Sequence, residues 1–266
     1  MEPLSERIRN YPAAAVAVQA TLQWLPVLVL LAIALWLLER DQRAAVSAAL
    51  GARERAGVDH AAGLIAAEIR LPLEDLPYLA DLPALQAWLA EGSPQALDRV
   101  ARDFLTFAHH RDAYAKVRLF NAEGTELVRI NGSGSGAELV PRGLLQNKAG
   151  RDFVRDGLAQ PPDRIHVSAF DLNVDNGVIE QPFRPMLRFS APVRSPAGEL
   201  RGLVTINYLG QPLLDELAQT AAELREFGLW LLDPAGHWLL GERPGDAGAE
   251  HLGGRLSGQR AVHGQH

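Results

Sequence analysis

The residues from Asn10 to Leu38 include no charged side chain. Within this run, the segment Ala13–Leu38 reads AAAVAVQATLQWLPVLVLLAIALWLL. A helix needs about 20 residues to cross the hydrocarbon core of a bilayer, so the run is long enough to span a membrane. Two glutamines and a proline make its first half less apolar, and we therefore expect the membrane span at Val16–Leu38.

A buried helix of a soluble domain and a cleaved signal peptide are the two other interpretations of this run. Apolar side chains surround every face of a helix from Leu25 to Leu38, which disfavours a soluble helix with one polar face. The segment Ala45–Ala48 (AVSA) resembles a signal-peptide cleavage site. The apolar run is too long for a signal peptide, however, and a charged helix follows it, so we favour a retained span.

The charges that flank the span indicate its orientation only weakly. Arg7 and Arg9 precede it, whereas four arginines follow it between Arg40 and Arg55. Because cytoplasmic flanks are usually the more positive, this distribution weakly favours an outside N-terminus. The rule loses force when a long segment is translocated, and most of the 266 residues follow this span. Charge alone therefore does not decide the orientation.

The composition excludes several classes of function. Hydrophobic residues make up 47% of the chain, which is enough for a packed core and too many for a disordered protein. Lys and Arg total 26 against 32 Asp and Glu, and this acidic balance argues against a nucleic-acid partner. The chain has no cysteine, which excludes disulfides, thiolate metal ligands and a cysteine nucleophile.

Three short motifs resemble ligand sites, but their surroundings do not support them. Gly132–Ala137 matches a dinucleotide fingerprint, yet Pro141 follows too soon for the helix that such a site requires. Asp171–Gly177 resembles a calcium loop in which the glycine and the final carboxylate are misplaced. His109 and His110 are adjacent and would face apart on a helix. We therefore expect no metal, no cofactor and no catalytic centre.

Helical patterns follow the apolar run. Glu39–Arg70 is rich in Ala, Glu and Arg and predicts a long amphipathic helix continuous with the membrane span. Its apolar positions are Val46, Leu50, Val58, Leu64, Ile65 and Ile69. We expect Pro72 and Pro77 to break this helix. A second helix is predicted through Trp88, and Ser93 followed by proline begins a third.

The pattern then changes to strands. Alternating segments predict five of them: Tyr114–Phe120, Thr125–Asn131, Arg164–Phe170, Met186–Val193 and Leu200–Leu209. The first two flank a turn at Asn121–Gly124 and form a hairpin. A Gly/Ser loop at Gly132–Gly136 leads to a short helix around Leu144–Leu158, and Gln211–Glu226 is helical. These elements predict an α+β fold, with the long helix lying across one face of a PAS-like five-stranded antiparallel sheet.

The segments from the first hairpin onward resemble the extracytoplasmic double Cache, or tandem PAS-like, sensor region of bacterial transmembrane receptors. They are VRLFNAEGTELVRIN (Val117–Asn131), LLQNKAGRDF (Leu144–Phe153), HVSAFDLNVDNGVIEQPFRPMLRFSAPV (His166–Val193) and RGLVTINY (Arg201–Tyr208). LWLLDPAGHWLLGERP (Leu229–Pro244) resembles the opening hairpin of the second, membrane-proximal lobe. The resemblance implies a cytoplasmic N-terminus and a sensor in the periplasm of a bacterium. Because the sequence shows one span, we expect a single-pass anchor in the inner membrane.

The end of the sequence departs from this family. Such receptors usually carry a second membrane helix and an output domain, such as a histidine kinase or a diguanylate cyclase. After Pro244 the chain has little apolar periodicity, and we expect a truncated, frameshifted or degenerate receptor. The expected parts are a cytoplasmic N-terminus at 1–15, the membrane helix at 16–38, and the long helix plus membrane-distal lobe at 39–226. An incomplete membrane-proximal lobe and an irregular tail follow at 227–266.

Cations on the first hairpin suggest a ligand pocket. Because side chains alternate along a strand, Lys116 and Arg118 share one face, and Arg129 shares a face with Asn131 on the partner strand. If Phe120 pairs with Thr125, Lys116 lies opposite Arg129, and Arg118 lies opposite Leu127. Three cations then crowd one face of the sheet, which is repulsive unless water or an anion intervenes.

Three residues on later strands complete this candidate ligand-binding site of Arg118, Arg129, Ser168, Asp171 and Arg188. Because the arginine fork suits a carboxylate, the expected ligand is a small anionic metabolite or an amino acid. Asp171 would then bind an amine or orient an arginine. A solvated face with structural ion pairs is the alternative.

Two classes of function remain open from the sequence. The first is a membrane-anchored, extracytoplasmic ligand-sensing module of a signal-transduction receptor that lacks its output domain in this chain. The second is a membrane-anchored scaffold that binds a protein partner without a small ligand. In either case the helix Glu39–Arg70 is expected to carry motion between lobe and membrane. It would pack on its own sheet and pair with its copy in a homodimer.

Overall fold

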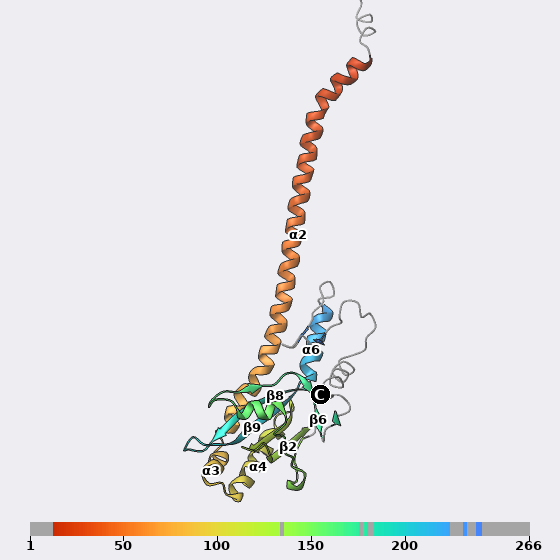
Figure 1. Cartoon of the computed structure of the whole chain (residues 1–266). Helices are drawn as coiled ribbons and strands as arrows, with labels where there is room; N and C mark the ends of the chain where they lie inside the picture. Colours follow the sequence, from red (N-terminus) through yellow and green to blue (C-terminus); the bar gives the residue numbers. More distant parts are fainter. Residues whose placement is uncertain are drawn as a thin grey trace, which may run out of the picture. The chain divides into compact units, whose positions relative to one another are not determined.

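The structure, a computed structural model, describes residues 13–133, 136–175, 178–179, 184–223, 231–232 and 238–240. The chain divides into two compact units, Met1–Ala56 and Gly57–His266. Helix α2 (Ala13–Ala80) supplies the described part of the first unit and the beginning of the second (Figure 1). The expected membrane helix and the long amphipathic helix are thus one helix, as predicted.

The first unit contains the apolar run. Among the described residues, one helix, beginning at Leu22, is long and apolar enough to cross a membrane, and the apolar window is fully exposed. Val46 and Leu50, which the sequence placed on an amphipathic stripe, are exposed too. Among the described residues of the first unit, nothing therefore covers these apolar side chains.

In the second unit, α2 becomes a core element. Its buried apolar residues there recur with helical spacing at Ala61, Leu76 and Leu79. The prediction that Pro72 and Pro77 break the helix is wrong, because α2 continues to Ala80. A proline removes one backbone hydrogen bond from a helix, and here the packing of the neighbouring turns holds the helix together despite that loss.

Two shorter helices follow, as predicted. Helix α3 (Pro83–Glu91) ends at Gly92, whose φ of 68° allows its N–H to donate to the carbonyl of Trp88 at 2.7 Å. Helix α4 (Pro94–His109) begins at Ser93, whose hydroxyl accepts a hydrogen bond from the N–H of Ala96 at 3.3 Å. The tight corner between α3 and α4 thus follows from one glycine and one serine cap.

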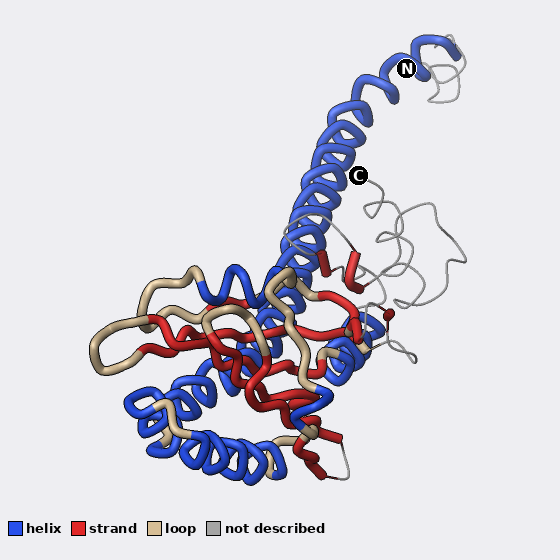
Figure 2. Tube along the Cα trace, turned by 60° about the horizontal axis from the view of Figure 1, so that its bottom comes forward, coloured by secondary structure: helices blue, strands red, loops and turns tan. Residues whose placement is uncertain are grey.

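A seven-stranded antiparallel sheet forms the centre of the second unit (Figure 2). Its strands are β1 (Tyr114–Asn121), β2 (Glu126–Ser133), β3 (Gly136–Leu139), β4 (His166–Val167), β5 (Asp171–Leu172), β8 (Pro185–Arg194) and β9 (Leu200–Leu209). They lie in the order β3-β2-β1-β9-β8-β4, and β5 also pairs with β8. The small hairpin β6 (Val174–Asp175) and β7 (Val178–Ile179) stands apart from this sheet.

The α+β fold class is confirmed, with differences at the edges of the sheet. The expected strand at Arg164–Phe170 is reduced to β4, and β5 adds a second short pairing with β8. The expected loop at Gly132–Gly136 instead continues β2 and begins β3. The expected helix at Leu144–Leu158 consists of the 3₁₀ turn η1 (Arg142–Leu144) and the helix α5 (Asp152–Leu158). The five-stranded core is therefore present within a wider sheet.

The two faces of the sheet differ in character. One face carries apolar side chains such as Val117, Leu119 and Ile206. It packs against Leu79 of α2, and against α3 and α4, which lie below the sheet in Figure 1. Helix α5 packs on the other face through Phe153 and Val154. Burial of this extensive apolar face is the main force that holds the helices on the sheet.

Helix α6 (Gln211–Glu223) packs on α2 within the second unit through Leu213, Leu217 and Ala61. The strands β10 (Leu231–Leu232) and β11 (Trp238–Leu240) pair antiparallel, as predicted for the last hairpin. The turn between them, the end of the helix predicted to Glu226 and the tail after Leu240 lie outside the described residues.

Candidate functional site

Two rows of polar side chains cover the face of the sheet opposite α3 and α4. Directly paired residues of an antiparallel sheet point to the same face. One row across β2, β1, β9 and β8 consists of Arg129, Arg118, Thr205 and Ser190. The next row on the same strands consists of Asn131, Lys116, Asn207 and Arg188. Seven of these side chains are buried, and Asn131 is half-buried.

Several polar atoms of these rows are left unpaired. Among the described residues, buried atoms without a hydrogen-bond partner include Asn131 Oδ1, Ser190 Oγ, Thr205 Oγ1, Asn207 Oδ1 and Arg129 Nε. A buried polar group without a partner costs about 1–3 kcal/mol, so native structures leave few of them. A concentration of such atoms on one face is typical of a site that binds a polar ligand.

A buried glutamate partly balances the first row. Glu126 is 2% exposed and pairs with Arg129, with Nη1 3.2 Å from Oε2. Its other oxygen lies 3.5 Å from the Nε of Arg118. The backbone N–H of Gln146 donates to the same carboxylate at 3.0 Å. One carboxylate therefore holds two arginines of the sheet in fixed positions.

Asp171 on β5 plays the corresponding part for the second row. Its Oδ1 accepts a hydrogen bond from Nη1 of Arg188, whose side chain is 3% exposed. Its Oδ2 lies 3.5 Å from Nη2 of Arg151, the residue directly before α5. Asp171 thus joins an arginine of the sheet to an arginine of the segment that covers it.

Phe153 of α5 lies among the guanidinium groups. The guanidinium carbons of Arg188, Arg118 and Arg151 lie 5.1, 5.8 and 5.9 Å from the centre of its ring. Cations at such distances are attracted to the face of an aromatic ring. Phe153 is 4% exposed, so it also closes this part of the site from solvent.

The remaining space beneath α5 is narrow. Arg118, Arg151, Phe153 and Arg188 line it together with Lys148 and Asn173. Its cavity volume is about 10 Å³, roughly the space of one water molecule. The face is therefore closed, and a ligand larger than water requires its covering segment to move.

The expected register of the first hairpin is wrong. Arg118 lies opposite Arg129, and Lys116 lies opposite Asn131, because a bulge interrupts the pairing between Leu119 and Phe120. The turn explains the shift, since the side chain of Asn121 accepts hydrogen bonds from the N–H groups of Glu123 and Thr125. The turn thereby closes one residue later than predicted.

The structure brings together four of the five predicted site residues: Arg118, Arg129, Asp171 and Arg188. Ser168 differs from these four, because its hydroxyl forms hydrogen bonds with backbone groups. Its Oγ accepts from the N–H of Arg188 at 3.0 Å and donates to the carbonyl of Ala169 at 2.8 Å. Ser168 therefore holds the segment next to β4 against β8.

Sequence reasoning missed Glu126 and Phe153. Strand alternation places Glu126 on the face opposite Arg129, but the bulge brings it to the same face, opposite Phe120. Phe153 lies on a helix that the sequence placed only approximately. The arginine two residues before the aromatic residue in GRDF was the available signal.

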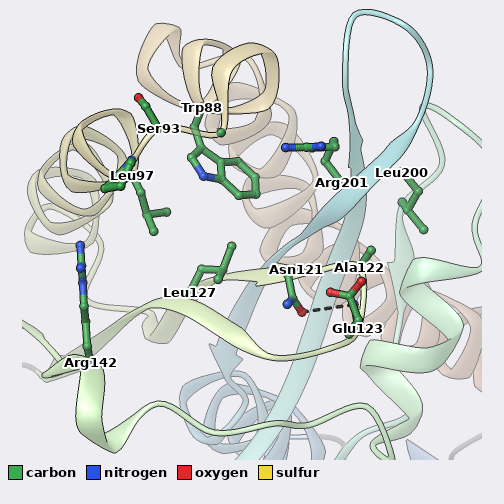
Figure 3. Close-up of a pocket in the computed structure, with 12 residues that line it drawn as sticks. Trp88, Ser93, Leu97, Asn121, Ala122, Glu123, Leu127, Arg142, Leu200 and Arg201 are labelled. Carbon is green, nitrogen blue, oxygen red and sulfur yellow. Dashed lines mark hydrogen bonds between the residues drawn. The ribbon is translucent and has the colours of Figure 1, made fainter.

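A second hollow lies at the opposite side of the hairpin (Figure 3). It has a volume of about 490 Å³, Leu97 and Leu127 line it, and the ring of Trp88 points into it. Arg142 stands at one side and Arg201 at the other. Although this hollow is the larger one, none of its described lining residues has a buried polar atom without a partner. We therefore assign the candidate site to the polar face of the sheet.

Two tyrosines on the apolar face tie the sheet to α2. The hydroxyl of Tyr114 donates to Asp75 at 2.6 Å, and Arg111 donates two further hydrogen bonds to the same carboxylate. Tyr208, directly opposite Tyr114, donates to Glu68 at 2.5 Å. Burial, and then the bond to its carboxylate, raises the pKa of each phenol well above its usual 10.0.

No protein-family model and no curated protein matches the sequence. Among solved structures, the chain is similar to a domain of a sensory box/GGDEF family protein from Vibrio parahaemolyticus. The TM-score is 0.52 at 20% identity, over 70% of this chain and 74% of that one. The extracellular domain of a protein assigned as a histidine kinase gives the same TM-score and identity, over 70% of each chain.

The chain has the fold of a Cache-type sensor domain. This similarity confirms the predicted α+β sensor architecture, although identities of this size show the fold alone. The ligand-binding domain of an amino acid chemoreceptor from Pseudomonas aeruginosa, solved with GABA, aligns at 24% identity over 70% of this chain and 74% of that one. Its TM-score of 0.47 adds no further support.

Proposed function

We propose that the chain is a membrane-anchored, extracytoplasmic ligand-sensing module of a signal-transduction receptor. The sensor-domain fold and the exposed apolar helix support this proposal. The sensing surface is the polar face of the sheet, where Arg118, Arg129 and Arg188 are buried. Its ligand is a small anionic metabolite or an amino acid.

One observation carries the proposal: the sheet buries four cationic side chains next to polar atoms that have no partner. Burial of a charged group costs free energy even when an opposite charge pairs with it, and a buried polar atom without a partner adds to that cost. A face that buries both kinds of group is typical of a binding site for a polar ligand. The polar face does not contact α3 and α4, because these helices pack on the apolar face. A binding role accounts for its burial and its charge together.

In the proposed topology, the sensing lobe lies outside the cytoplasm. Residues 1–15 lie in the cytoplasm, residues 16–38 span a bacterial inner membrane, and the sensing lobe at 39–226 lies in the periplasm. The hairpin of β10 and β11 begins a second, membrane-proximal lobe at 227–266. The exposed stripe at Val46 and Leu50 is available for pairing with a second copy of the chain.

Thermal unfolding of the full chain in lipid nanodiscs tests the sensing function. A ligand that binds only the folded state stabilises it by about 2.7 kcal/mol at a concentration of 100 times Kd. The panel comprises carboxylates, amino acids, phosphate and neutral sugars, with tryptophan fluorescence as the signal. At least one small anion or amino acid is expected to raise the unfolding temperature of the second unit.

Two arginine variants test whether the ligand that stabilises the chain binds at the polar face. Arg188→Met removes a buried cation of the polar face, whereas Arg142→Met removes an exposed cation of the hollow in Figure 3. Stabilisation should disappear in Arg188→Met and persist in Arg142→Met. If no compound stabilises the chain, a scaffold that binds a protein partner becomes the better explanation.

A further inference from the structure

The hollow of Figure 3 has the size of a small-molecule site. Its volume of about 490 Å³ lies within the range of about 300–1,000 Å³ that is typical of such sites. The corner between α3 and α4, the turn between β1 and β2, the turn η1 and the beginning of β9 enclose it. Leu97 and Leu127 of its lining pack on the apolar core, so the hollow lies on the side of the sheet away from the polar face.

One wall of the hollow is apolar. The ring of Trp88 points into the hollow, and Leu127 points toward that ring from β2 (Figure 3). Leu97 and Leu200 also line it, and all three leucines are half-buried. An aromatic ring placed against this wall would remove apolar surface from water and stack at an offset on the indole. The wall therefore suits a ligand that carries an aromatic ring.

A cation without a partner faces this wall. Arg201 is half-buried at the beginning of β9 and points toward Trp88 (Figure 3). Within the part of the chain that the structure describes, no group forms an ion pair or a hydrogen bond with its guanidinium. A side-chain carbon at Gly92 would lie 3.2 Å from Nη2 of Arg201, so the glycine leaves room for this guanidinium beside the end of α3. The planar fork of Arg201 is therefore available for a carboxylate.

The other charged groups that line the hollow are less suited to a ligand. Arg142 already has a carboxylate partner, since its Nη2 lies 2.6 Å from Oδ1 of Asp98. Glu123 lies on the turn between β1 and β2, where it is exposed and water screens its charge. A half-buried charge gains more from a partner than an exposed charge does, because solvent screens it less. The charges thus favour an anionic group at Arg201 over an ammonium group at Glu123.

We propose that the hollow is a second binding site, separate from the polar face, and that its ligand is an aromatic monocarboxylate. The ring of the ligand lies against Trp88 and Leu127, and its carboxylate accepts hydrogen bonds from the guanidinium of Arg201. This site uses none of the buried arginines of the polar face. The inference therefore goes beyond the proposed sensing function and does not depend on it.

Calorimetric titration of the full chain in lipid nanodiscs tests this site, with empty nanodiscs to correct for probes that enter the lipid. The probes are phenylacetate, acetate, phenethylamine and phenylalanine, which separate the contributions of ring, carboxylate and ammonium. Phenylacetate should bind at least about tenfold more tightly than acetate, the effect of burying a phenyl ring. It should also bind more tightly than the two ammonium compounds, because their ammonium groups would lose water without a half-buried carboxylate as partner.

Arg201→Met removes the guanidinium and keeps an apolar side chain, and Arg99→Met is the matched control. Arg99 is an exposed arginine of α4 that does not line the hollow. Phenylacetate should bind Arg201→Met at least about tenfold more weakly than the parent, the effect of losing a hydrogen bond to a charged group. It should bind Arg99→Met as tightly as the parent. Arg201→Lys keeps the charge but not the fork, so its affinity should lie between those of the parent and Arg201→Met.

Equal circular dichroism and thermal unfolding of the ligand-free variants would show that each is folded. Phenylacetate that binds Arg201→Met as tightly as the parent, or that does not bind the parent at all, refutes the inference. Equal affinities for phenylacetate and acetate would exclude a role for the apolar wall. Tighter binding of phenethylamine or phenylalanine would assign the hollow to a ligand with an ammonium group. None of these outcomes decides the sensing function, which depends on the stabilisation that Arg188→Met removes.

Discussion

Replacement of Tyr114 and Tyr208 by phenylalanine should change how stability depends on alkaline pH. Both phenols are buried, at 1% and 2% exposure, and each donates a hydrogen bond to a carboxylate of α2. Hydrogen bonds to charged groups contribute about 1.5–3 kcal/mol each. At pH 8 the free energy of unfolding of the double variant should therefore be lower than that of the parent by at least about 3 kcal/mol.

This difference should shrink as the pH rises. An unfolded tyrosine ionises near pH 10, whereas the raised pKa of Tyr114 and Tyr208 keeps both protonated in the folded protein. Their contribution is complete below pH 10 and is lost as the pH rises toward the folded pKa. Linkage gives a loss of about 0.4 kcal/mol per tyrosine at pH 10 and about 1.4 kcal/mol at pH 11. The two tyrosines together lose about 2.8 kcal/mol by pH 11.

Urea unfolding of the full chain at pH 8, 10 and 11, followed by tryptophan fluorescence, measures the effect. The curves of the parent and the double variant should converge by pH 11. Tyr78→Phe is the control, because Tyr78 is 58% exposed on the same helix, and it should follow the parent. If the gap at pH 8 persists unchanged at pH 11, the phenols titrate alike in both states and the reasoning is wrong.

Three further predictions concern packing, pairing and topology. Gly157→Ala should destabilise the lobe by about 1–3 kcal/mol in urea unfolding, because the new methyl carbon would lie 2.8 Å from a side-chain carbon of β8. Gly150→Ala is the control and should leave stability nearly unchanged, because its methyl group enters open space. Cysteines at Arg43 or Arg53 should form intermolecular disulfides in membranes if α2 pairs with its copy, and no cross-link along several turns would indicate a monomer. A reporter that is active only in the periplasm should work when fused after Arg201, and activity of only a cytoplasmic reporter would reverse the proposed topology.

The alternation of apolar and polar residues predicted the central strands, but it did not predict that their polar side chains are buried. Leu200–Leu209 was predicted with its observed bounds, because apolar and polar residues alternate along it. Alternation usually marks a strand with one solvated face. Here Thr205 and Asn207, two polar residues of this strand, are fully buried. A sequence cannot show which polar residues another segment will cover, since that depends on where α5 packs.

Two features could not be predicted from the sequence pattern: the bulge in the first hairpin and the continuation of α2 past Pro72. The bulge after Leu119 depends on hydrogen bonds from the turn to Asn121, and it moves Glu126 to the polar face. The continuation of α2 past Pro72 depends on packing by Leu76 and Leu79, which are fully buried. A local turn overrides the pattern in the first case, and a tertiary contact does so in the second. The cations of the candidate site and Asp171 could therefore be predicted from the sequence, whereas Glu126 could not.

The polar face of the sheet and the hydrogen bonds that hold α2 share the same two strands. Tyr114 and Tyr208 hold Asp75 and Glu68 on the apolar side of β1 and β9. The next row on these strands pairs Lys116 with Asn207 on the polar side, and a bulge separates Tyr114 from Lys116. A bulge is a place where a strand shifts its pairing by small backbone rotations.

If the polar face binds an anion, as we propose, a change in this bulge would reach the tyrosines directly. Lys116 and Tyr114 are two residues apart on one strand, so no long chain of intermediate contacts is required. Two sites are coupled when both bias the same two-state element. If the register of β1 and β9 at the bulge has two arrangements, it couples the two faces, because one face carries the cations and the other carries the hydrogen bonds that hold α2.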